Sequence, residues 1–158
     1  MAATAPKAST YPFIAFNFSV EIKRAGESAT LAGAAFSECD GLEVTMEVKT
    51  IREGGNNRRQ IRLPGPLAYG QLTLKRGMTS NLDLWKWVND TADDPTLRAD
   101  VAVVMLAQDG ETELARFVLT RCLPLKLKAP ALNAKDGMVA IEEFQLAYES
   151  LALKPPKT

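Results

Sequence analysis

A short, strongly basic stretch holds the residues of this chain whose types and spacing are best suited to recognition chemistry. Arg52, Arg58, Arg59 and Arg62 lie close together, with Glu53 as the single acid among them. Four arginines and one glutamate give a local charge of +3, whereas 19 basic and 19 acidic residues leave the whole chain neutral. Because no global field exists, any electrostatic recognition must be local. The stretch therefore predicts a surface that meets an acidic partner; a solvated surface loop is the alternative.

The centre of this stretch is turn chemistry. Gly54, Gly55, Asn56 and Asn57 tolerate positive φ at little cost, as tight turns require. The stretch follows a strongly alternating segment and is too long for a simple turn. We therefore expect an extended hairpin arm over residues 50–65. Its backbone N–H groups offer only a weak anion-binding pattern.

Most catalytic chemistry is excluded by composition. The chain has no histidine, which removes Ser-His-Asp and Cys-His schemes and most zinc sites. It also lacks the glycine patterns that cradle phosphates and dinucleotides. The acidic pairs Asp93-Asp94 and Glu142-Glu143 do not converge on one substrate, because the first lies in a predicted loop and the second points to opposite faces of a strand. The sequence predicts a protein that is not an enzyme and has no cofactor or metal.

The cysteines and the chain ends bear on location. Cys39 and Cys122 have no CxxC spacing and are typical of buried small side chains in a reducing compartment. Residues 1–10 lack the apolar core of a signal peptide, and no apolar run reaches the length of a membrane span. We expect a chain that is made in the cytosol, stays soluble and does not insert into a membrane.

The elements that position the basic stretch follow from alternation of apolar and polar residues, which predicts about seven or eight strands. Most of these strands are expected at Ile14–Ile22, Ala34–Glu38, Leu42–Val48, Gln71–Arg76, Val101–Ala107, Ala115–Thr120 and Met138–Leu151. Pro124 and Pro130 predict an irregular connection before the last strand. We place one domain at residues 11–152, between a flexible arm at 1–10 and a tail at 153–158.

One helix is predicted at about residues 80–91. Ser80 is the expected N-cap, and Asp83 three residues later resembles a capping box. The apolar stripe consists of Leu82, Trp85 and Val88, widened by Leu84 and Trp87. A single helix among many strands favours a mainly β, antiparallel two-sheet sandwich or barrel with the helix against it. Edge strands of such sheets must be closed, covered or paired with another chain.

Several short motifs occur in a fixed order over about residues 13–90. They are Phe36-Ser-Glu-Cys-Asp-Gly-Leu42, Val44 to Arg52, Glu53-Gly54-Gly55, Leu63-Pro64-Gly65, Leu72-Thr-Leu-Lys-Arg-Gly77 and Leu84-Trp-Lys-Trp87. In this order they resemble the tail-tube (inner tube) protein family of contractile-tailed phages and phage-like contractile injection systems.

The resemblance implies a tail-tube/Hcp-like fold of two packed sheets with one flanking helix. It also implies six-membered rings that stack into a hollow tube inside a contractile sheath. Sheath and baseplate proteins would be partners, and the lumen would carry DNA or protein cargo across a target envelope. Assembly in the cytoplasm, as part of a phage tail or a contractile particle, would agree with the absence of a signal peptide.

Ring closure by a repeated head-to-tail contact needs two complementary patches on one subunit. We expect the basic arm to be one patch, reaching an adjacent subunit or ring, and acidic residues after the helix to be the other. The expected contact residues are Arg52, Glu53, Gly54, Gly55, Asn56, Asn57, Arg58, Arg59 and Arg62 on the arm, and Asp90, Asp93 and Asp94 after the helix.

Three alternatives stay open at the level of sequence. The chain could be a hexameric effector-carrier ring of a type VI-like secretion system, or a baseplate-proximal paralogue that initiates the tube. It could also be a monomeric β-barrel that binds a small apolar ligand. A carrier would form discrete rings that stack poorly, and a ligand barrel would stay monomeric. The basic arm argues mildly against the ligand barrel, which has no use for it.

Overall fold

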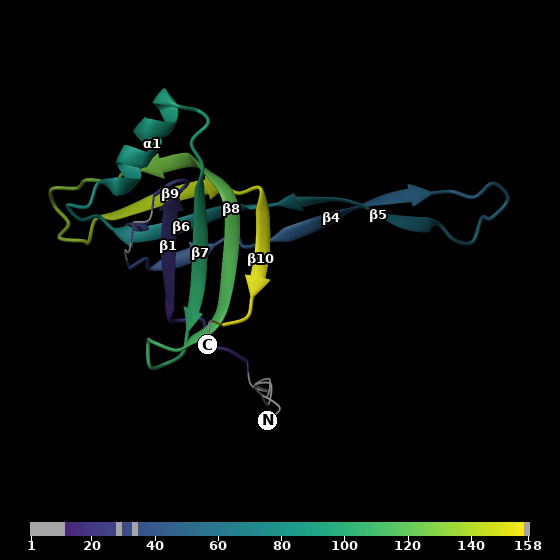
Figure 1. The fold of residues 1–158 in the computed structure, drawn as a ribbon, viewed down its shortest axis with the longest axis horizontal. Coiled ribbons are helices and arrows are strands. Elements are labelled where there is room, and N and C mark those ends of the chain that lie inside the picture. The colour runs from purple at the N-terminus through teal and green to yellow at the C-terminus, as the bar shows by residue number, and fades with distance from the viewer. Residues whose placement is uncertain (1–11, 28–29, 33–34, 157–158) are drawn as a thin grey trace.

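In a computed structural model, residues 12–27, 30–32 and 35–156 are described, and these ranges contain ten β-strands and one α-helix (Figure 1). In chain order the elements are β1 (Phe18–Arg24), β2 (Thr30–Ala32), β3 (Glu38–Asp40), β4 (Val44–Ile51), β5 (Ile61–Tyr69), β6 (Gln71–Gly77), α1 (Asp83–Asp93), β7 (Ala99–Leu106), β8 (Glu113–Lys128), β9 (Ile141–Ala147) and β10 (Ser150–Lys154).

Two antiparallel sheets form the body, and β8 belongs to both. Its first part pairs with β7 and β10, and its last residues, from Leu123 to Lys128, pair with β9. The complete order is β2-β1-β7-β8-β9-β6-β3, with β10 also on β8. Because β2 and β3 do not pair within the described residues, the path does not close. The prediction of a mainly β, antiparallel fold with one helix is confirmed, and the body is sandwich-like rather than a closed barrel.

The core lies between the two sheets and under α1. Alternating side chains of β1, β6 and β9 are buried, as the period of a strand requires. Trp87 of α1 packs on Phe144 of β9 with ring centroids 5.5 Å apart. Burying such large rings contributes heavily to core stability, so the tryptophan of α1 fastens the helix to the sheet.

The helix begins at Asp83, later than predicted, and the proposed Ser80 cap is wrong. The N-cap position is Leu82, which makes no side-chain cap hydrogen bond, and Asn81 Oδ1 instead accepts from the Asp83 N–H at 2.9 Å. The buried apolar face of the helix also differs from the predicted apolar stripe. Leu84 and the tryptophan at 87 are fully buried, whereas Leu82 is 56% exposed, because it precedes the first helical turn.

Two strands start later in the chain than predicted. The segment from Ile14 is not a strand until Phe18, since the ladder with β7 ends at the pair Phe18–Met105. A strand over 34–38 does not form either. Ala34 lies outside the described residues, and β3 begins only at Glu38.

The C-terminal region also differs from the prediction. β8 continues through Pro124, where a connection was expected. Proline is tolerated at sheet edges and bulges, and Pro124 sits on the edge of the second sheet beside a register shift. The predicted last strand is divided into β9 and β10, and β10 runs to Lys154, inside the segment expected to be a tail.

A two-stranded arm of β4 and β5 projects from the body (Figure 1). Its strands span Val44 to Tyr69, so it is longer than the predicted arm over residues 50–65. At its root, the Tyr148 hydroxyl lies 2.8 Å from the carbonyl oxygen of Gly41 and 3.1 Å from the Glu43 nitrogen. These contacts tie the first strand of the arm to the end of β9.

Gly41 is required at this root. Its φ is +99°, and a Cβ there would lie 1.9 Å from the carbonyl oxygen of Gln71. No side chain fits such a close approach of two backbone segments. The direction in which the arm leaves the body is therefore fixed by backbone packing.

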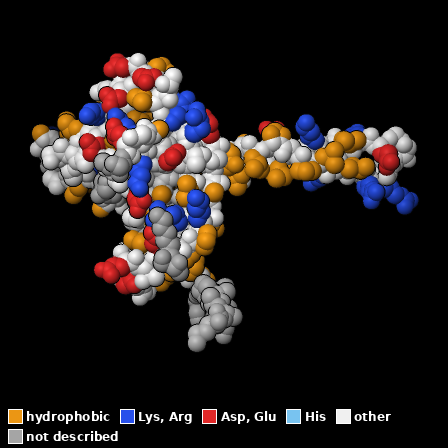
Figure 2. Space-filling model, viewed as in Figure 1, with side chains coloured by type: hydrophobic (Ala, Val, Ile, Leu, Met, Phe, Trp, Pro, Cys, Tyr) orange, Lys and Arg blue, Asp and Glu red, His pale blue; other side chains and the backbone are white. Residues whose placement is uncertain are grey.

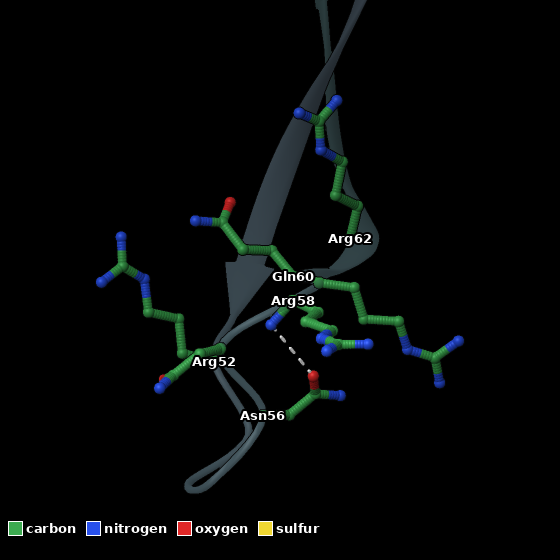
Figure 3. Close-up of a pocket in the computed structure, with 7 residues that line it drawn as sticks. Arg52, Asn56, Arg58, Gln60 and Arg62 are labelled. Carbon is green, nitrogen blue, oxygen red and sulfur yellow. Dashed lines mark hydrogen bonds between the residues drawn. The ribbon is translucent and has the colours of Figure 1, made fainter.

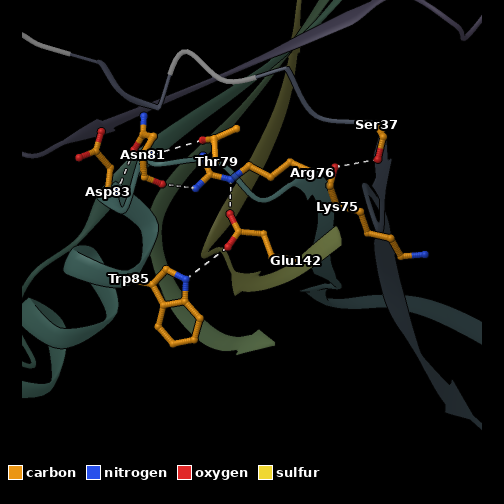
Figure 4. Close-up of polar contacts among 8 residues, drawn as sticks. All are labelled: Ser37, Lys75, Arg76, Thr79, Asn81, Asp83, Trp85 and Glu142. Atoms are coloured by element: carbon orange, nitrogen blue, oxygen red, sulfur yellow. Dashed lines mark hydrogen bonds and ion pairs between the residues drawn. The ribbon is translucent and has the colours of Figure 1, made fainter. Parts of the chain in front are cut away.

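A buried polar cluster joins α1 to the second sheet (Figure 4). Arg76 and Glu142, both 2% exposed, form an ion pair between β6 and β9. Trp85 Nε1 donates to Glu142 at 3.3 Å, and Arg76 Nη2 donates to the carbonyl oxygen of Asn81 at 3.0 Å. The pair therefore holds the start of the helix against the sheet.

We expect Glu142→Gln to lower the free energy of unfolding by about 3–5 kcal/mol, because it leaves Arg76 as a buried charge without a counter-ion. Chemical denaturation monitored by tryptophan fluorescence measures the change. Glu149→Gln is the matched control, since Glu149 pairs with Arg121 on the surface and its loss should cost no more than about 1 kcal/mol. Equal effects of the two variants would contradict a structural role for the buried pair.

Gly41→Ala should destabilise the protein more than Gly55→Ala. Both glycines have positive φ, so both substitutions carry a backbone strain of about 1–2 kcal/mol. Only at Gly41 does the new Cβ also meet a backbone oxygen, since nothing lies within 4 Å of the Cβ built at Gly55. Thermal unfolding followed by circular dichroism compares the two. A similar melting temperature for both variants would show that the root tolerates displacement.

Candidate assembly interface

The part of the arm nearest the body has one apolar face. Antiparallel pairing places Val44 opposite Tyr69, Met46 opposite Leu67 and Val48 opposite Pro64. Directly paired residues share a face of the ribbon, so these side chains form one surface, here called the stem face. The stem face comprises Val44, Met46, Val48, Pro64, Leu67 and Tyr69.

The stem face is exposed to an unusual degree for apolar side chains. Val44, Met46, Val48 and Leu67 are each 50–56% exposed, and Figure 2 shows apolar side chains along the arm. In the first sheet of the body, by contrast, the inward side chains Val20 and Ile22 of β1 are buried. Contiguous exposed apolar surface of this kind marks a protein interaction site. The sequence predicted the alternation correctly but not that the apolar face lies outside the body.

The tip of the arm carries the basic stretch. The turn is closed by the Asn56 N–H, which donates to the carbonyl oxygen of Glu53 at 3.1 Å. The Arg58 N–H donates to Asn56 Oδ1 at 3.2 Å, and Gly55 has φ +90° (Figure 3). The Gly-Gly-Asn-Asn turn therefore lies where the sequence placed it. Arg52, Arg58 and Arg59 lie in the loop between the two strands, and Arg62 is the second residue of β5.

The arginines form an open basic surface rather than a closed ligand site. They line a hollow of about 490 Å³ with Asn56, Asn57 and Gln60. Figure 3 shows the guanidinium groups of Arg52, Arg58 and Arg62 splayed apart instead of converging on one point. Within the described residues, none of the four arginine side chains forms an ion pair or hydrogen bond. The tip can thus engage several anionic groups of a broad partner surface.

The acidic residues expected to meet the arm lie elsewhere on the same subunit. Asp90 is paired with Arg24 at 2.8 Å, so its charge is already used within the chain. Asp94 accepts hydrogen bonds from the Thr96 hydroxyl and N–H, which lower the pKa of its carboxyl. Asp93 is exposed at the end of α1. The arm points away from the body that carries them (Figure 1), so the two sets can meet only between subunits.

The Arg76–Glu142 ion pair was not predicted from the sequence, although the alternation of residues along β6 and β9 indicated it. Glu142 has the same parity along β9 as the buried Phe144, and Arg76 has the same parity along β6 as Leu74. Alternation alone therefore placed both charges on inward faces. Charged residues are almost never fully buried unless paired, so their opposite charges indicated the ion pair.

The described residues offer no catalytic or metal centre. They contain no group of three or more His, Cys, Asp or Glu side chains that could hold a metal ion. Burial raises the pKa of Cys39 to about 11 and of Cys122 to about 12, which opposes formation of a reactive thiolate. No helix within the described ranges is long and apolar enough to cross a membrane.

Solved structures with the same fold come from contractile injection systems. A chain from the baseplate of the anti-feeding prophage (AFP) superposes with a TM-score of 0.82 at 24% identity, covering 93% of this chain and 98% of that one. A chain from the sheath-tube complex of the extracellular contractile injection system PVC gives 0.80 at 19% identity, with 98% and 99% covered. Hcp1 from Flavobacterium johnsoniae is more distant, at 0.53 and 15% identity, with 89% and 96% covered.

Comparison of sequences gives the family. No curated protein sequence matches the chain significantly. The family model described as "T4-like virus tail tube protein gp19" matches residues 14–152, which includes the arm, the helix and both sheets. This match covers most of the chain and confirms the resemblance found in the motifs. The chain therefore belongs to the T4-like virus tail tube protein family, and it is a structural tube subunit rather than an enzyme.

Proposed function

We propose that this chain forms six-membered rings that stack into a hollow tube within a contractile sheath. The observation that carries the proposal is the arm: Val44, Met46, Val48 and Leu67 of its stem face are about half exposed, and among the described residues its tip arginines form no ion pair. A surface that a chain cannot satisfy alone must be covered by another copy or by another protein. An arm on one side and a different receiving surface on the body make a head-to-tail contact, which closes rings or propagates stacks.

Family membership and the relatives with the same fold support the proposed partners. Solved relatives come from an AFP baseplate and from a PVC sheath-tube complex. By analogy, sheath and baseplate proteins are partners of this chain, and the tube lumen carries cargo across a target envelope. The chain assembles in the cytoplasm and then forms part of a phage tail or a contractile particle.

The two parts of the arm have different tasks in this assembly. The arginine tip steers the encounter and sets specificity, because complementary charge acts mainly on association and register. Its acceptors include Asp93 and Asp94 of a neighbouring subunit, which are exposed and, unlike Asp90, form no ion pair among the described residues. The stem face supplies the apolar contact area that holds the subunits once they meet.

A discrete effector-carrier ring of the Hcp type is the second candidate. The fold similarity to Hcp1 favours it, although the TM-score of 0.53 is well below the values near 0.8 for the AFP and PVC chains. The long exposed arm favours continuous stacking, since a discrete ring would leave such surface uncovered. A baseplate-proximal initiator ring would share the arm and differs only in its position along the tube.

Reversing charge at the tip should weaken stacking and leave the fold intact. We expect the double variant Arg58→Glu, Arg59→Glu to form shorter tubes or unstacked rings, because like charges then face each other across the contact. Ultracentrifugation of assembled material, with electron microscopy of the pellet, measures the loss. Arg58→Gln, Arg59→Gln removes the charge without reversing it and should give an intermediate defect. Tubes of normal length in the reversed variant, with normal circular dichroism, would exclude the tip from assembly.

A further inference from the structure

Met46 lies in the middle of the stem face, and no other residue of that face contains sulfur. It stands directly opposite Leu67 of β5, between Val44 and Val48 on β4, and its side chain is 52% exposed. A flexible thioether adapts to many apolar partners, but it is also a group that oxidants attack. The surface proposed to hold the subunits together therefore has a reactive atom near its centre.

The two cysteines compete poorly with this thioether for an oxidant. A peroxide reacts with the thiolate form of cysteine, so its rate follows thiolate character and exposure. Burial raises the pKa of Cys39 to about 11 and that of Cys122 to about 12, so both thiols stay protonated at neutral pH. Cys122 is also fully buried. A thioether reacts without losing a proton, and at Met46 it is open to solvent in the single subunit.

Oxidation at this position changes the chemistry of the stem face. A peroxide transfers one oxygen atom to the sulfur: its O–O bond breaks, an S–O bond forms and water leaves, so the thioether is oxidised and the peroxide is reduced. The sulfoxide is polar and accepts hydrogen bonds. Val44, Val48 and Leu67, which surround it, have no side-chain donor. An apolar surface that covers the sulfoxide leaves its oxygen without a partner, which opposes association.

We propose that Met46 is an oxidation-sensitive switch of assembly. A peroxide converts it to the sulfoxide in free subunits, and the oxidised subunits do not join a tube. The inference rests on the proposed function, because it requires that the stem face be covered in the assembly. Covered residues are shielded from the oxidant, so the switch acts on free subunits and spares those already assembled. Methionine sulfoxide reductases, with a thiol as reductant, restore the thioether.

Met138 provides a comparison within the same chain. It lies between the end of β8 at Lys128 and the start of β9 at Ile141, and its side chain is 83% exposed. Met138 is therefore more accessible than Met46 and should be oxidised at least as readily. Because it lies outside the stem face, its oxidation leaves that face apolar. Position, and not exposure alone, makes Met46 the sensitive residue.

The experiment treats the purified natural chain with hydrogen peroxide below the concentration at which it assembles. Catalase then removes the oxidant, and the protein is concentrated. Mass spectrometry of peptides measures oxidation at each methionine, and ultracentrifugation measures the assembled fraction. We expect subunits oxidised at Met46 to give at least about tenfold less assembled protein, because a covered polar group without a partner weakens association by this factor or more. Circular dichroism shows whether the fold is kept.

Two variants locate the effect. Met46→Leu nearly conserves volume and apolar character and removes the sulfur, so it should assemble like the natural chain both before and after peroxide. Met138→Leu is the matched control, and it should lose assembly after peroxide as the natural chain does. Peroxide added to tubes that have already formed should leave Met46 unoxidised.

The outcomes separate the switch from the function on which it rests. Normal assembly of the natural chain after full oxidation of Met46 would overturn the switch and leave the tube function standing. Equal loss of assembly in peroxide-treated Met46→Leu would also overturn it, since the sensitive residue would then lie elsewhere. Oxidation of Met46 at the same rate in tubes and in free subunits would contradict the shielding. Failure of the untreated natural chain to assemble at any concentration would overturn both proposals.

Discussion

The arm has no core of its own, and the rest of the structure depends on this constraint. A two-stranded ribbon in water is marginally stable at best unless a third strand or another surface covers one face. Here four side chains of the stem face are about half exposed, and the body covers none of them fully. The protein therefore carries its apolar contact area on an element that another molecule must cover. The chain buries the apolar side chains of the stem face only when it assembles.

Contacts within the body hold the root of the arm and helix α1 in fixed positions. Gly41 and Tyr148 fasten the root of the arm to β6 and β9, so its direction is set before any partner arrives. The Arg76–Glu142 pair holds α1 on the same sheet, and α1 ends in the acidic residues proposed to meet the arm. Both sets of contacts involve β6 and β9. Pre-organisation of this kind reduces the ordering cost of association.

Alternation predicted the paired strands of the body well, because each has one face on the core. β6 was expected at 71–76 and forms at 71–77, and the helix and the Gly-Gly-Asn-Asn turn also lie close to their predicted places. Alternation failed for Val44–Val48, since it shows that one face is apolar and not which molecule covers it. It also failed before Phe18, where the pattern continues but the partner strand ends. Whether the sheets close into a barrel depends on pairing between strands that are distant in the sequence, such as β2 and β3. The local pattern of apolar and polar residues carries no information about such pairing.

The most direct test of this account removes the arm and asks whether the body remains alone. Residues 46–67 would be replaced by Asn-Gly, a two-residue hairpin turn joining the directly paired Thr45 and Ala68. The mass in solution would be measured by light scattering beside the natural chain at equal concentration. The account predicts a folded monomer from the shortened chain under conditions in which the natural chain forms rings or tubes. Multimers of equal size from both chains would contradict it.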